Sequence, residues 1–199
     1  NYVYRPVFDD IVKSIQSAAI KTHSITTNYE QILNEFGPTI SNDIVNLKYT
    51  LFKYNYITSD ALTENKIAYD ESTGKVSDVY VDGTWINPYG IRPLFAFSPS
   101  AMFCTNPSVT YQFTDTPALR NVGILNVWFD AGDGTGYRAI DKSSASVVVN
   151  YTTSGDKTLK LRVRTTSGEV FESHAKMSIC NELNHGNLSE DTTEDYEPS

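Results

Sequence analysis

The 199-residue sequence has few of the side chains that build reactive centres, with two cysteines and three histidines. His23, His174 and His185 are too scattered for a zinc-ligand spacing, and we interpret His174 as a surface or hydrogen-bonded histidine. No Gly-x-Ser-x-Gly nucleophile motif is present, and no glycine-rich phosphate loop precedes a helix. We therefore predict no catalytic residue, no metal site, no cofactor and no enzymatic activity within these residues.

Basic residues are outnumbered, with 16 Lys and Arg against 24 Asp and Glu and a formal net charge of −8. This balance argues against nucleic acid as a partner, because phosphate binding needs clustered positive charge. No apolar run reaches 18 residues, so no membrane-spanning segment is predicted. The chain begins at Asn1 without an apolar leader, and we expect a processed mature chain or a fragment.

The two cysteines, Cys104 and Cys180, are too far apart in sequence to suggest a metal site. In an oxidising compartment they could form a disulfide, with a stabilisation of roughly 4 kcal/mol from loop closure. The alternative is a pair of unpaired buried thiols, and the sequence leaves both open.

Helical patterns are confined to the first 37 residues. Asp9 and Asp10 are expected in the first turn of a helix, where acidic side chains are favourable. The side chains of adjacent residues on a helix point in different directions, so these two are not expected to act as a catalytic pair. The apolar stripe of this helix is Ile11, Ile15 and Ala18. A second short helix is predicted over 28–36, before Gly37 and Pro38.

From residue 44 onward, apolar and polar residues alternate in short segments separated by turns. The predicted strands or short apolar segments cover 45–54, 93–97, 109–113, 147–151, 159–163 and 170–179, and 58–90 is polar and rich in turns. Short strands with glycine turns and no helix between them indicate a mainly β chain with an antiparallel β-sandwich.

The segment Phe129-Asp130-Ala131-Gly132-Asp133-Gly134 has an aromatic residue, an aspartate and then Gly-Asp-Gly. Tyr151, a turn at Gly155, an alternating strand and a turn at Ser167-Gly168 follow. This order resembles the PKD-like domain, an immunoglobulin-like sandwich of extracellular proteins. The sequence departs from that family at Val149, where His is frequent, and at Lys157, where an aromatic residue is usual.

The glycines and aspartates of this segment fit a structural turn. Gly132 and Gly134 suit positive φ angles, and Asp130 and Asp133 can accept backbone N–H hydrogen bonds. A calcium loop is the alternative, but an EF-hand would need a glutamate where Asp141 stands.

A wider similarity covers residues 44–180, carried by the phrases at 130–138 and 149–160. These look like large secreted proteins of Bacteroidota, especially flavobacteria, several of which continue into an α/β-hydrolase-like domain. The resemblance implies an accessory part of an exported protein that uses the type IX secretion route.

We expect three parts: a β-rich module with short N-terminal helices over 1–118, a PKD-like sandwich over 119–180 and an acidic linker or tail over 181–199. The two modules could share a core. The tail acids are Glu190, Asp191, Glu194, Asp195 and Glu197.

Aromatic residues are abundant, with 13 Tyr and 9 Phe. Most are explained by core packing, but Tyr80, Trp85 and Tyr89 fall in the turn-rich segment, where loops on a rigid sandwich often carry binding. These three are the candidate binding residues, as a platform for a protein or a sugar.

The function that these features favour is a non-catalytic accessory or interaction module at the bacterial cell surface, outside the cell. Its expected partner is a protein, for example an outer-membrane complex or further domains of the same chain. The alternatives are a carbohydrate-binding module and an accessory domain of a secreted α/β-hydrolase-like enzyme.

Overall fold

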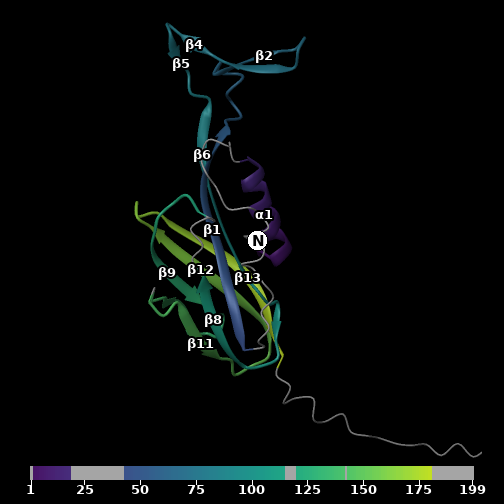
Figure 1. The fold of residues 1–199 in the computed structure, drawn as a ribbon, viewed down its shortest axis with the longest axis vertical. Coiled ribbons are helices and arrows are strands. Elements are labelled where there is room, and N and C mark those ends of the chain that lie inside the picture. The colour runs from purple at the N-terminus through teal and green to yellow at the C-terminus, as the bar shows by residue number, and fades with distance from the viewer. Residues whose placement is uncertain (1, 19–42, 115–119, 142, 181–199) are drawn as a thin grey trace, which may run out of the picture.

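The structure is a computed structural model that describes residues 2–18, 43–114, 120–141 and 143–180. Two sheets form the body of the molecule (Figure 1). The first contains, in spatial order, β11 (Ser146–Asn150), β8 (Ser108–Thr114), β1 (Ile44–Ile57) and β6 (Tyr89–Pro99). The second contains β10 (Arg138–Ala139), β9 (Ile124–Asp130), β12 (Gly155–Thr165), β13 (Val170–Ile179) and β7 (Phe103–Cys104).

Most neighbouring strands are antiparallel, and the mainly β class with a sandwich is confirmed. Two pairs are parallel: β1 with β8, and β13 with β7. The alternation of apolar and polar residues explains why two sheets pack together. One side of each strand is apolar and must be covered by the other sheet.

Aromatic rings join the two sheets at the centre of the core. Phe129 of β9 is fully buried, and its ring centroid lies 4.8 Å from that of Tyr111 and 5.2 Å from that of Phe113, both on β8. The surrounding core includes Leu47, Leu51, Leu159, Leu161, Met177 and Ile179.

Strands from both sides of residue 118, the predicted module boundary, belong to the same sheets. β8 precedes the boundary and pairs with β11, which follows it. β7 also precedes the boundary and pairs with β13. One cluster of buried residues runs through all of them, so the two segments share a core.

The helix α1 (Arg5–Ala18) begins earlier than predicted. Asp9 is one turn inside it and accepts a hydrogen bond from Arg5 Nε at 3.2 Å, so the expectation of acids in the first turn was wrong. The physical reason is the apolar pair Phe8 and Val12, which packs on Ala96 of β6 and extends the buried stripe toward the N-terminus. The helix predicted over 28–36 lies outside the described residues.

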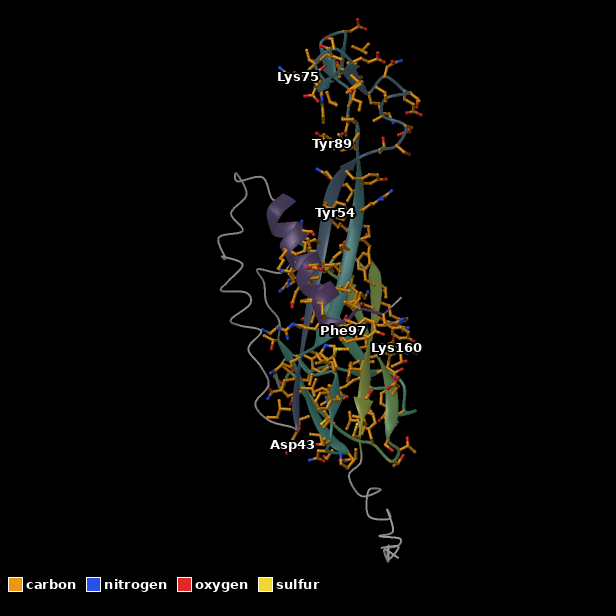
Figure 2. The ribbon with its side chains drawn as sticks, turned by 90° about the vertical axis from the view of Figure 1, so that its right-hand side faces the viewer. Asp43, Tyr54, Lys75, Tyr89, Phe97 and Lys160 are labelled. Carbon is orange, nitrogen blue, oxygen red and sulfur yellow. The ribbon has the colours of Figure 1, made fainter. Side chains whose placement is uncertain are left out.

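The strands β1 and β6 continue beyond the sandwich as a two-stranded ribbon (Figure 1). Two small hairpins lie at its end: β2 (Ile67–Asp70) with β3 (Lys75–Asp78), and β4 (Tyr80–Val81) with β5 (Thr84–Trp85). We call residues 54–92 the arm. Figure 2 shows Tyr54 and Tyr89 on the ribbon and Lys75 at the far end from Asp43. Among the described helices, none is long and apolar enough to cross a membrane.

A charged cross-strand cluster lies on the outer face of the second sheet. Arg162 Nε and Nη2 donate to Glu172 Oε2 at 3.0 and 2.8 Å, and His174 Nε2 lies 2.8 Å from Oε1. Burial alone would raise the pKa of Glu172, but hydrogen bonds, those of His174 and Arg162 among them, outweigh it and lower the pKa to about 2.

We predict an acid-dependent loss of stability from this cluster. Because the pKa of Glu172 is below its usual 4.5 in the folded chain, its contribution is present above about pH 4.5 and is lost as the pH falls toward 2. The Glu172→Gln variant should be less stable than wild type at pH 7 and should lose less free energy of unfolding between pH 4.5 and pH 2. Urea titrations at several pH values measure this, with Glu71→Gln at an exposed turn as the control. An unchanged acid slope in Glu172→Gln would contradict the prediction.

Candidate binding surface on the arm

On one face of the ribbon, side chains of β1 and β6 contact each other. Tyr56 lies opposite Gly90, and a Cβ atom at Gly90 would be only 2.8 Å from Cε1 of Tyr56, so the ring covers the glycine. The guanidinium carbon of Arg92 lies 4.0 Å from the centroid of the same ring, within range of a cation–π interaction. These contacts cover part of this face, and Tyr54 on the same side is 43% exposed.

The other face of the ribbon carries three exposed apolar side chains, with the polar Asn55 opposite one of them, Ile91. Ile57 and Tyr89 are paired across the strands, and Ile91 follows on the same side; they are 48%, 43% and 67% exposed. Side chains alternate along a strand, so this side is also the side of Leu51 and Phe97, which are buried in the core. The inner face of the first sheet therefore continues onto the arm, where the second sheet no longer covers it (Figure 1).

The structure brings the three predicted aromatic residues together. Tyr80 and Trp85 are paired across the β4–β5 hairpin, and the ring centroids of Trp85 and Tyr89 are 6.3 Å apart. Tyr80 is 62% and Trp85 41% exposed. The planes of the Trp85 and Tyr89 rings make an angle of 42°, so these two rings do not form one flat platform.

Sequence reasoning missed Ile57 and Ile91, because the predicted strands ended at residue 54 and resumed at residue 93. The local pattern gave no signal for Ile57, because the polar Lys53 and Asn55 interrupt the apolar alternation after Leu51. The exposure of Ile57 and Ile91 depends on where the second sheet ends, which a local pattern does not reveal.

The segment at the end of the arm is acidic. The segment 58–88 contains six acidic and two basic residues, a formal charge of −4. Lys66 Nζ lies 3.5 Å from Asp60 and 2.6 Å from Glu64, which balances part of that charge. Asp70 accepts hydroxyl hydrogen bonds from Ser72 and Thr73, which lower its pKa and keep it ionised. The remaining charged residues are Glu71, Asp78, Asp82 and Lys75.

The Asp-Gly turn after β9 is hydrogen bonded within itself. Asp130 Oδ1 accepts from the Gly132 backbone N–H at 2.9 Å, and Asp133 Oδ1 accepts from that of Thr135 at 3.2 Å. Burial would raise the pKa of Asp133, but hydrogen bonds, first that of Arg138, lower it. Both carboxylates thus accept backbone hydrogen bonds that fix the geometry of the turn.

Tyr151 attaches this turn to the core. Its hydroxyl donates to the Ala131 carbonyl at 2.8 Å and lies 2.6 Å from the Tyr111 hydroxyl. Burial raises the pKa of Tyr151 to about 12, so the hydroxyl stays protonated and can donate.

The two cysteines are close along the backbone, and the structure contains no disulfide bond between them. The Cys180 N–H donates to the Cys104 carbonyl at 2.8 Å, yet Cys104 is buried and Cys180 exposed. Cys104 pairs with Ile179, whose side chain shares its buried face, and Cys180 is the next residue. Burial raises the pKa of the Cys104 thiol. The disulfide stays a prediction that would require the chain at Cys180 to turn.

No family model matches the sequence, and no curated protein matches it closely. The PKD1 domain of Vibrio anguillarum Epp is similar to part of the structure, with a TM-score of 0.26 and 16% identity over 31% of this chain and 67% of that domain. The PKD1 domain of the Vibrio cholerae metalloprotease PrtV has a TM-score of 0.26 and 18% identity, over 31% of this chain and 69% of that domain. A 2,6-sialyltransferase of Photobacterium sp. JT-ISH-224 has a TM-score of 0.25 and 10% identity, over 40% of this chain and 16% of that enzyme.

Proposed function

We propose that this chain is a non-catalytic interaction module of an exported protein and that it binds a protein partner through the arm. The supporting observation is a group of exposed large apolar side chains that neighbour one another on the arm: Tyr80, Trp85, Tyr89, Ile57 and Ile91. Clustered large apolar side chains in water are unfavourable by about 25 cal/mol per Å² of accessible area, and such clusters mark interaction sites.

The shape of the surface favours a protein over a carbohydrate. A sugar ring stacks best on a flat aromatic face, whereas Trp85 and Tyr89 are tilted by 42°. Aliphatic Ile57 and Ile91 extend the surface along the ribbon, and they offer a sugar no hydrogen bonds. A protein partner can follow such an uneven apolar surface.

The cellular setting that we propose is supported by two resemblances. The PKD-like motif at 129–134 supports an extracellular or cell-surface location. The phrases at 130–138 and 149–160 support an origin in Bacteroidota and type IX secretion, for which we propose an outer-membrane complex as the partner. An accessory role beside a hydrolase domain is compatible with the same arm. In either case the arm supplies the contact and the sandwich holds it in place.

The test is mild purification of the native protein after chemical cross-linking. We expect wild type to recover a protein partner and the variant Tyr80→Ser, Trp85→Ser, Tyr89→Ser to lose it. Val148→Ser, 61% exposed on the sandwich, is the control and should keep the partner. Retention of the partner by the triple variant would overturn the role of the arm. Retention of wild type on insoluble polysaccharide, lost in the triple variant, would favour the carbohydrate-binding alternative.

A further inference from the structure

We propose that the arm docks by its inner face, and not by its strand edges, on an apolar and positively charged β-structured segment of its partner. This inference rests on the proposed function and adds the mode of docking and the chemistry of the partner. Three features of the arm carry it: its edges, its two faces and its charge.

The edges of the ribbon are protected where it leaves the sandwich. The Asn121 side chain bonds both backbone groups of Lys53, accepting from its N–H and donating to its carbonyl at 2.8 Å each. Opposite Lys53 stands Pro93, which has no N–H to offer to an added strand. Only four residue pairs remain beyond this point before the hairpins, Tyr54–Ile57 with Tyr89–Arg92. A partner strand would find few backbone groups in a row along either edge.

The two faces of the ribbon differ in the contacts that their side chains make. On one side, Tyr56 covers Gly90 and interacts with Arg92. On the inner side, Ile57, Tyr89 and Ile91 lie on the same side of the strands as the residues that the second sheet covers lower down, and Lys53 and Asn55 stand between the two groups on β1. Paired sheets pack about 10 Å apart through such apolar faces. A β-structured segment of the partner would therefore take the position that the second sheet leaves open.

The negative charge of the arm favours a positively charged partner. The segment at the end of the arm has a formal charge of −4, and only Lys66 forms ion pairs there, with Asp60 and Glu64, among the described residues. A partner surface that carries Lys and Arg around its apolar residues complements this charge. A second copy of this chain would bring another −4 to the same place and −8 overall, so repulsion disfavours it.

The experiment uses the full chain and three synthetic β-hairpin peptides as probes. Their strands alternate Val with Lys, Val with Glu, or Ser with Lys, and binding is measured by isothermal titration calorimetry at low and high salt. We expect only the Val/Lys hairpin to bind. Its affinity should fall about tenfold or more in Ile91→Asn and severalfold in Asp78→Asn, Asp82→Asn, with a salt dependence that weakens in the second variant.

The matched control is Val148→Asn, which replaces an apolar residue on the sandwich that is 61% exposed, against 67% for Ile91, and should bind as wild type does. Equal binding of the Ser/Lys hairpin would show attraction by charge alone and overturn the docking mode, and equal binding of the Val/Glu hairpin would overturn the cationic partner. Dimerisation in sedimentation that Ile91→Asn abolishes would assign the face to a second copy. If cross-linking shows an arm-dependent partner but Ile91→Asn leaves the Val/Lys affinity unchanged, the proposed function stands and this inference fails.

Discussion

Replacement of Gly132 by alanine should lower the free energy of unfolding by about 2–5 kcal/mol. Gly132 has a φ of +68°, a conformation that side chains with a Cβ adopt at a cost of about 1–2 kcal/mol. The new Cβ atom would also lie 2.7 Å from the carbonyl oxygen and 3.0 Å from the nitrogen of Thr158. Thr158 is part of β12 in the centre of the second sheet, so neither atom can move without a shift of that strand.

The same turn provides a matched control in Gly134. Its φ of +88° is also positive, but a Cβ atom there would meet nothing within 4 Å. Gly134→Ala should therefore show the conformational cost alone, about 1–2 kcal/mol. Urea unfolding of wild type and both variants separates strain from close approach. Equal losses in the two variants would mean that the contact with Thr158 carries no part of the effect.

The turn is also where sequence reasoning was most informative. Gly132 and Asp130 were predicted as turn residues from local chemistry, and their backbone angle and hydrogen bond are local properties. The strands at 109–113 and 159–163 likewise fall inside β8 and β12, because a period of two along the chain follows from a strand buried on one side. Features that depend on a few neighbouring residues could be predicted.

What could not be predicted depends on contacts between distant segments. The parallel pairing of β1 with β8 and the position of β8 between β1 and β11 have no local signal. The arm is a similar case, because β1 reaches Ile57 only through its pairing with β6, which follows more than thirty residues later. The aromatic residues of the binding surface could be named from composition and turns. Its aliphatic part depends on the extent of the second sheet.

Truncation of Phe129 to alanine should have the other large effect, a loss of about 3–5 kcal/mol in the free energy of unfolding. The ring is fully buried and contacts rings from the opposite sheet, at centroid distances of 4.8 Å to Tyr111 and 5.2 Å to Phe113. Such aromatic pairs contribute about 0.5–1.5 kcal/mol beyond the area that they bury. Val148→Ala, at a 61% exposed position, is the control and should change stability by no more than about 0.5 kcal/mol.

The way in which this loss is distributed tests whether the segments on either side of residue 118 fold as one unit. Phe129 belongs to the later segment, and the two rings that it contacts belong to β8 in the earlier one. If the shared core makes unfolding cooperative, amide hydrogens of β1 and β8 should lose protection by the same free energy as those of β12 and β13. Hydrogen exchange followed by mass spectrometry measures both groups in one sample. If β1 and β8 kept their wild-type protection while β12 and β13 lost theirs, the earlier segment would be stable by itself and the predicted boundary would separate two folding units. Equal losses would mean that the segments on both sides of residue 118 unfold as one cooperative unit.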